Sequence, residues 1–265
     1  MKPHSLQEVL QLASEQQLQQ WHDLSLSYAS GHGDLVLRET ISERYPGLSA
    51  DNVLTFAGAQ EAMFCAFHAL LNAGDEVLGI SPQFEPLRLL PVSIGVRLNE
   101  FELSPQPTGW QLDTEQFVGQ ITPVTKMVAI NFPHNPTGAQ IDRASLDSIV
   151  ESCRQRQSWL FSDEVFQGLE YHESECLPPV ASVYEKGISL GVISKAYGLG
   201  GVRVGWLVSQ DKALLQRALQ IKRFLSISNG RTDELLATIV LQHGEGLLQQ
   251  NRQQVRQNLD REHHR

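Results

Sequence analysis

The sequence predicts an α/β fold built around a largely parallel central sheet. Short apolar runs alternate with helix-like patterns over most of the 265 residues, which is the arrangement of repeated strand–helix units. The runs are apolar at successive positions, as expected for strands that helices cover on both faces. Polar motifs follow directly after several of these runs, and ligands of such folds collect at the carboxyl ends of the strands.

The expected elements follow in chain order. One amphipathic helix is predicted over residues 5–23 and a second over 34–45, with Gly33 and Asp34 as its cap. Strands are predicted at 52–56, 76–80, 95–101, 126–131, 159–162, 188–194 and 204–208. Helices are predicted between several of them, at 60–71, 84–91, 142–156 and 211–224. Two further helices are predicted at 232–243 and 245–265.

The composition argues against several classes of function. The net charge of −9 disfavours nucleic acid as the main partner, because a phosphate backbone needs a basic face. No apolar stretch is long enough to span a membrane, and the N-terminal segment lacks the apolar core of a signal peptide. Cys65, Cys153 and Cys176 are too few for a disulfide scaffold and have no metal-ligand spacing. We therefore expect a cytoplasmic protein without a metal site or a membrane partner.

The most informative segment runs from Ser194 to Trp206. Lys195 follows a buried apolar run and precedes a glycine-rich turn, Arg203 and a second apolar run. A lysine at the end of a buried strand is unfavourable unless it is paired or chemically used. One such use is an imine with a cofactor aldehyde, although an ordinary surface lysine is the commoner meaning of such a residue taken alone.

Two further strand ends carry groups of suitable chemistry. Asn135 lies in a rigid turn before Pro136, where its amide could donate to a ligand oxygen. Asp163 follows the 159–162 run, and a carboxylate there needs a cationic partner such as a protonated pyridine. Taken alone, each could also be part of an ordinary loop or a helix cap.

The remaining candidates suit a phosphate and a flat ring. The turn at 57–62 joins a strand to a helix with small residues, and the N–H groups at a helix start suit an anion. Arg203 could add a bidentate contact and Ser194 a hydroxyl. Phe84 lies just beyond a strand end, where its ring could stack on a cofactor. Taken alone, a turn of small residues more commonly binds no phosphate, and an aromatic residue at such a position usually belongs to the core.

Together these segments resemble the class I and II aminotransferases, which are pyridoxal-phosphate enzymes of fold type I. The matching residues occur in the family's order, from about Tyr28 to Trp206. They are Tyr28, Gly31, Leu37-Arg38, Gly58-Ala59-Gln60-Glu61-Ala62, Gly74-Asp75-Glu76-Val77, Pro82-Gln83-Phe84, Asn131, Pro133, Asn135-Pro136-Thr137-Gly138, Asp163-Glu164, Ser194-Lys195, Gly198 and Gly201-Val202-Arg203-Val204-Gly205. The resemblance implies the family's three-layer sandwich with a mostly parallel central sheet.

The resemblance also implies a role for each candidate residue. Lys195 would carry the aldimine with pyridoxal 5'-phosphate and move the proton between the substrate α-carbon and the cofactor. Asp163 would keep the pyridine nitrogen protonated. Asn135 would donate to the ring phenolate oxygen, and Phe84 would stack on the ring.

The resemblance further implies how the phosphate and the partners would bind. The phosphate would contact the backbone of residues 58–60 together with Ser194 and Arg203. Tyr28 would reach the phosphate of a neighbouring subunit, because the family's sites lie at a dimer interface, so a homodimer is expected. The substrates would be an amino acid and a 2-oxo acid.

Two positions depart from the family's usual pattern. Phe166 stands where the family usually has a tyrosine, and Val192 stands where a serine or threonine is common. The missing tyrosine hydroxyl would stabilise the phenolate oxygen, so we expect the imine to stay protonated to higher pH than in typical relatives. An absorbance titration that gives an ordinary, low imine pKa would contradict this expectation.

The length also departs from the family. Relatives continue into a small C-terminal domain whose arginine binds the substrate carboxylate. No arginine near the C-terminal end matches that motif, so none is assigned the role: Arg223, Arg231, Arg252 and Arg256. We expect an N-terminal helix and linker at 1–33, the cofactor-binding large domain at 34–244, the start of a long interdomain helix at 245–265, and no C-terminal small domain.

Three alternatives to an aminotransferase stay open at this point. A β-lyase or a cyclising enzyme of the same fold would use the same cofactor residues. A truncated fragment could bind the cofactor without turnover. A nucleotide-binding dehydrogenase is disfavoured, because the glycines at 198–201 precede a strand instead of joining a strand to a helix.

Overall fold

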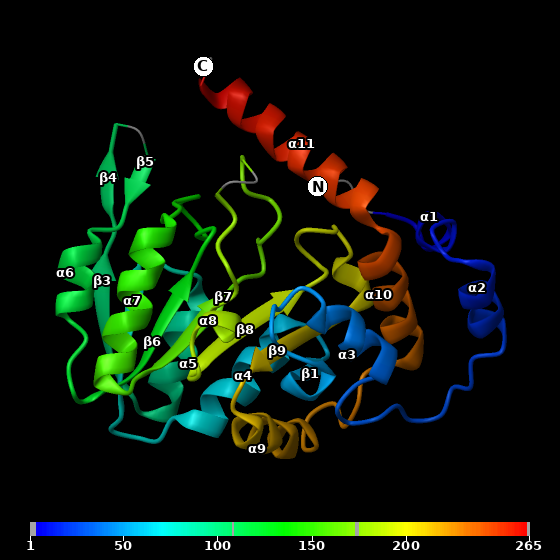
Figure 1. Cartoon of the computed structure of the whole chain (residues 1–265), viewed down its shortest axis with the longest axis horizontal. Helices are drawn as coiled ribbons and strands as arrows, with labels where there is room; N and C mark the ends of the chain where they lie inside the picture. Colours follow the sequence, from blue (N-terminus) through cyan, green and yellow to red (C-terminus); the bar gives the residue numbers. More distant parts are fainter. Residues whose placement is uncertain (1–3, 108, 173–174, 264–265) are drawn as a thin grey trace.

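A computed structural model of the chain describes residues 4–107, 109–172 and 175–263. A seven-stranded sheet forms its centre, with helices on both faces (Figure 1). The strands are β1 (Val53–Phe56), β2 (Glu76–Ser81), β3 (Arg97–Glu102), β6 (Thr125–Asn131), β7 (Trp159–Asp163), β8 (Gly187–Val192) and β9 (Gly205–Ser209). Their spatial order is β1-β9-β8-β7-β6-β2-β3. Strand β9 runs antiparallel to both neighbours, whereas β8, β7, β6, β2 and β3 pair in parallel, which confirms the predicted fold class.

Helices form the two outer layers of the sandwich. One face of the sheet is covered by α4 (Ala59–Leu70), α5 (Glu85–Ile94) and α9 (Lys212–Lys222). The other face is covered by α3 (Leu35–Ser42), α6 (Thr114–Gly119), α7 (Arg143–Arg156), α8 (Val180–Val183) and α10 (Arg231–His243). Strand β1 lies at one edge of the sheet, next to α3 (Figure 1).

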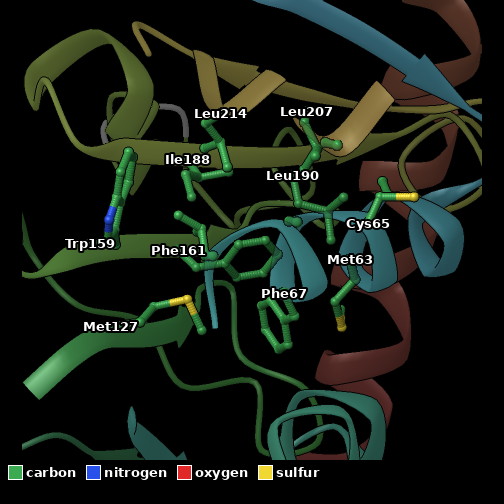
Figure 2. Close-up of a cluster of buried hydrophobic side chains, with 14 of the residues drawn as sticks. Met63, Cys65, Phe67, Met127, Trp159, Phe161, Ile188, Leu190, Leu207 and Leu214 are labelled. Atoms are coloured by element: carbon green, nitrogen blue, oxygen red, sulfur yellow. The ribbon is translucent and has the colours of Figure 1, made fainter. Parts of the chain in front are cut away.

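The central strands are buried on both faces because successive side chains point to opposite layers. In β6, Met127 and Ala129 belong to the core under α4, while Val128 and Ile130 belong to the core under α7. Figure 2 shows Phe161 of β7 beside Phe67 of α4, with ring centroids 4.9 Å apart in an edge-to-face arrangement. This pattern explains why the apolar runs in the sequence are continuous and do not alternate with polar residues.

Some predicted elements are wrong in extent. The single helix expected at 5–23 is two helices, α1 (Leu6–Leu10) and α2 (Glu15–His22). Ser14 starts the second helix: its Oγ accepts from the backbone N–H of Gln17, and the Gln17 side chain accepts from the N–H of Ser14. The strand expected to reach residue 194 ends at Val192.

Several elements were not predicted at all. They are the hairpin of β4 (Ser104–Gln106) and β5 (Gly109–Gln111), the short helices α6 and α8, and the 3₁₀ turns η1 (Ala50–Asn52) and η3 (Gly200–Val202). These pieces are too short to give a clear period in the sequence. The remaining predicted elements lie within a few residues of the observed ones.

The last described helix, α11 (Glu245–His263), extends away from the sheet (Figure 1). It touches the body of the protein through its first turns, where the buried Asn251 donates from Nδ2 to the carbonyl oxygen of Ala196 at 3.0 Å. Of the helices within the described ranges, none has the length and apolar character needed to cross a membrane.

Candidate active site

A cavity of about 140 Å³ lies where the sequence analysis expected a ligand, next to the carboxyl ends of β7 and β8. Most of the predicted site residues line it. The lining residues are Ala59, Gln60, Met63, Phe84, Asn135, Asp163, Val165, Phe166, Val192, Ser194, Lys195 and Arg203. Side chains from segments distant in the sequence therefore meet in one space, as a shared ligand site requires.

Asp163 forms the buried floor of this cavity. It is the last residue of β7 and is 2% exposed. Its Oδ1 accepts a 3.2 Å hydrogen bond from the backbone N–H of Val165. Burial raises the pKa of Asp163 to about 7, and the positive charge of Lys195 acts in the opposite direction. A carboxyl group in this setting favours a cationic group on a ligand, which would restore its ionised form.

Lys195 lies at the exposed side of the cavity, three residues beyond the end of β8. Its Nζ is 5.6 Å from the centroid of the Phe166 ring, within the range of a cation–π contact. The Lys195 carbonyl accepts from the N–H of Gly198 at 3.0 Å, and α11 holds the next carbonyl, that of Ala196. The backbone around the lysine is thus fixed, while its amine stays accessible.

Asn131 connects Asp163, at the end of β7, with the turn after β6 that contains Asn135. It is not one of the predicted site residues. It is 3% exposed at the end of β6, and its Nδ2 donates to the carbonyl oxygen of Asp163 at 2.7 Å. Its Oδ1 accepts from the N–H of Asn135 at 2.8 Å. One buried side chain therefore sets the relative position of Asp163 and Asn135. A polar residue inside an apolar run is the sequence signal that could have identified it.

The turn that carries Asn135 is held internally by His134. Its Nδ1 shares a 2.7 Å hydrogen bond with Oγ1 of Thr137. Burial lowers the pKa of His134 to about 4, so the ring is neutral at physiological pH. The turn that holds Asn135 is therefore fixed by a side chain, His134, that carries no charge.

The β1–α4 turn has the geometry of an anion cradle. Gly58 caps α4 with φ 93° and ψ 171°, a conformation that glycine adopts far more readily than other residues. A Cβ at Gly58 would collide with the guanidinium of Arg203, so the two approach closely only because the side chain is absent. The first N–H groups of a helix lack partners within the helix, and Ala59 and Gln60 of α4 line the cavity.

Arg203 contacts this cradle from the connection between β8 and β9. It adopts a left-handed backbone conformation with φ 53° at the end of η3. Its Nη2 donates to the carbonyl oxygen of Ala57 at 3.4 Å, and its Nη1 donates to that of Gly200 at 3.2 Å. Lys195 and Arg203 both lie on the connection between β8 and β9. The arrangement offers a guanidinium and helix N–H groups to one anion.

Tyr28 is the predicted site residue that lies elsewhere. It is 82% exposed and borders a separate surface depression that Arg231 also lines. Its expected contact is with the site of a neighbouring subunit, so that role stays a prediction. Phe166 and Val192, the two departures from the usual pattern, both line the cavity, and neither offers a hydroxyl there.

Comparisons with known proteins identify relatives of the chain. Residues 3–263 match the family described as aminotransferase class I and II. The chain is 32% identical over 187 residues to an arginine–pyruvate transaminase of Pseudomonas aeruginosa, covering 68% of this chain and 47% of that protein. It is 31% identical over 227 residues to the capreomycidine synthase of Streptomyces vinaceus, covering 85% of this chain and 57% of that protein. The chain spans about half the length of these curated relatives.

A solved structure extends the likeness to three dimensions. A PLP-dependent aminotransferase from Streptococcus suis superposes with a TM-score of 0.88 at 29% sequence identity. The match covers 98% of this chain and 69% of that one.

Proposed function

The chain belongs to the aminotransferase class I and II family, and we propose that it binds pyridoxal 5'-phosphate and transfers an amino group between an amino acid and a 2-oxo acid. The observation that carries this proposal is the meeting of Lys195, Asp163 and Arg203 in one cavity. These three residues supply an amine, a buried carboxyl group and an anion-binding guanidinium. Pyridoxal phosphate uses a lysine amine for its covalent attachment and a partner for its ring nitrogen, and a guanidinium suits its phosphate.

The residues present fit this cofactor. The cradle at Gly58 has no room for a side chain next to Arg203, and the helix N–H groups beside it suit a phosphate. The pKa of Asp163, raised to about 7 by burial, suits a carboxyl group that pairs with a protonated ring nitrogen. Phe84 lines the same cavity and offers an aromatic face for the ring.

When bound, pyridoxal phosphate supplies an aldehyde that reacts with primary amines and a ring that accepts electrons. The Nζ of Lys195 would hold the cofactor covalently and then move a proton at the substrate α-carbon. Asp163 would accept a hydrogen bond from the ring N–H, and the Asn135 amide would donate to the ring oxygen. The residues proposed to bind the phosphate are Gly58, Ala59, Gln60, Ser194 and Arg203.

We extend the proposal to the assembly and the domains. Residues 34–244 would form the cofactor-binding domain, and 245–265 would begin an interdomain helix. Tyr28 would contact the phosphate in a second subunit of a homodimer, which its exposure permits. Sedimentation of the cofactor-loaded protein tests the dimer: a monomer at micromolar concentration would contradict it.

The deciding experiment is labelling of the lysine. The purified chain is incubated with pyridoxal phosphate, its absorbance is recorded, and borohydride reduction is followed by peptide mapping. We expect a band near roughly 400–430 nm and a label on Lys195. Lys195→Ala is the control and should give neither. A folded wild-type protein without the band, or a label on another lysine, would refute the proposal.

A cyclising enzyme is the second candidate. A solved structure of a PLP-dependent cyclase superposes on this chain with a TM-score of 0.89 at 27% sequence identity, covering 98% of this chain and 67% of that one. The cofactor residues serve both reactions, so the products separate them. The loaded protein is mixed with individual amino acids and the products are analysed by mass spectrometry. Release of a 2-oxo acid supports the aminotransferase, and a ring-closed amino acid supports the cyclase.

A further inference from the structure

Lys222, at the end of α9, is a fully buried lysine that the proposed reaction does not use. Its side chain is 0% exposed. Its Nζ donates three hydrogen bonds: to the carbonyl oxygens of Gly31 at 2.9 Å and Thr55 at 2.8 Å, and to Oδ1 of Asn229 at 2.9 Å. All three protons of the ammonium are therefore engaged. Burying an ammonium group is unfavourable, so a buried lysine needs a structural or functional explanation.

Two carboxylates near Lys222 favour its charged form. Burial lowers the pKa of Lys222 to about 8, while the charges of Glu61 and Glu234 act against that change. Glu61 accepts from the backbone N–H groups of Ala57 at 2.6 Å and Ser226 at 3.1 Å. Glu234 accepts from Oγ1 of Thr55 at 3.1 Å. The carboxylates thus bind the same segments that the lysine connects.

These contacts converge on residues 55–57, the end of β1 and the turn that leads into α4. The carbonyl of Thr55 accepts from Lys222, and the carbonyl of Phe56 accepts from Nδ2 of Asn229 at 2.7 Å. The N–H of Ala57 donates to Glu61. Side chains from α4, α9 and the following loop therefore fix the backbone that precedes the anion cradle.

The turn needs this support because β1 lies at the edge of the sheet. On its inner side β1 pairs with β9. On its outer side the N–H of Thr55 donates to the carbonyl of His32 at 3.2 Å, and Lys222 bridges the carbonyls of Gly31 and Thr55. The ammonium of Lys222 thus holds residues 31–32 against the outer edge of β1, next to the turn that leads into α4.

We propose that Lys222 is a positioning residue that holds the Thr55–Gly58 turn in place and so sets the affinity of the site for the phosphate group of its cofactor. This inference rests on the proposed pyridoxal-phosphate site. It assigns to Lys222 no contact with the cofactor: the ammonium acts through the carbonyl of Thr55, and Asn229 acts beside it through the carbonyl of Phe56.

The test compares two ligands that differ by the phosphate. Dissociation constants for pyridoxal phosphate and for pyridoxal are measured by absorbance for the wild type and for Lys222→Met, which keeps an unbranched side chain as far as Cε and removes the three donors of Nζ. We expect the affinity for pyridoxal phosphate to fall about tenfold or more, with pyridoxal changed by less than about threefold. Lys212→Met, at the exposed start of the same helix, is the control and should change neither.

A second measurement does not depend on the cofactor. Hydrogen exchange of the amides at 57–62 in the cofactor-free protein should be faster in Lys222→Met than in Lys212→Met. Should Lys222→Met fail to fold, Asn229→Ala removes the neighbouring bond to Phe56 and should show the same phosphate-specific loss. Equal loss for both ligands, or unchanged exchange and affinity, would overturn the role of Lys222. A wild-type protein that binds neither ligand would instead overturn the proposed function on which the role rests.

Discussion

Replacing Gly58 by alanine tests the anion cradle directly. The backbone of Gly58 has φ 93° and ψ 171°, a region that is nearly exclusive to glycine, so alanine should cost about 1–3 kcal/mol of strain. The new methyl group would also collide with the guanidinium of Arg203. Arg203 would then have to leave its position beside the carbonyl of Ala57.

The loss of cofactor affinity follows from the displaced arginine. A hydrogen bond to a charged group contributes about 1.5–3 kcal/mol, which corresponds to about 10–100-fold in a dissociation constant. We therefore expect Gly58→Ala to bind pyridoxal phosphate about 10–100-fold more weakly. Its free energy of unfolding without cofactor should fall by about 1–3 kcal/mol from the backbone strain.

Absorbance titration with pyridoxal phosphate measures the first quantity, and urea denaturation of the cofactor-free protein measures the second. Gly74→Ala is a suitable control, since Gly74 also has a positive φ, 87°, but has open space where the Cβ would be. It should lose stability without losing affinity. If Gly58→Ala bound the cofactor as tightly as the wild type, the phosphate would not be held between this turn and Arg203.

Three further predictions concern stability. Asn131→Leu leaves the carbonyl of Asp163 and the N–H of Asn135 without their buried partner, so urea denaturation should show a loss of about 2–4 kcal/mol; a loss below about 0.5 kcal/mol would contradict the bridging role. Burial raises the pKa of Asp163 to about 7 and that of Glu164 to about 8, so the folded protein holds these protons more tightly than the unfolded chain. The free energy of unfolding of the cofactor-free protein should then fall between about pH 4 and about pH 8, and Glu164→Gln should flatten the fall, whereas an equal pH dependence in the variant would refute the assignment. Phe161→Ala removes a fully buried ring between α4 and β7 and should cost about 3–5 kcal/mol by the same assay, with a cost below about 1 kcal/mol showing that the core closes over the gap.

The fold could be predicted because its central strands β6, β7 and β8 are buried on both faces. Continuous apolar runs such as the one at Met127–Ile130 leave few alternatives to a covered parallel sheet. The position of the cavity followed from the same fact, because the polar residues come directly after the runs. Asp163 and Lys195 end or follow neighbouring strands, and the sheet brings them together.

The supporting contacts could not be predicted because they depend on tertiary structure. Lys222 reaches the carbonyl of Gly31 across 191 residues, and nothing local to either position indicates the pairing. Asn131 looked like one member of a motif, although its buried side chain joins two strand ends. The break between α1 and α2 was a different case: the Ser14 and Gln17 capping pair is visible in the sequence but was outweighed by the amphipathic pattern around it.

Lys195 and Arg203 belong to a single connection whose two ends, at β8 and β9, are fixed by adjacent paired strands. The connection therefore sets the distance between the amine of Lys195 and the guanidinium of Arg203. This distance does not depend on how separate domains dock. A ligand that engages both groups must match that separation. Insertion of a residue at 199–201 would increase this distance and leave both side chains chemically intact. One molecule could then no longer be attached to Lys195 and bind its phosphate at Arg203.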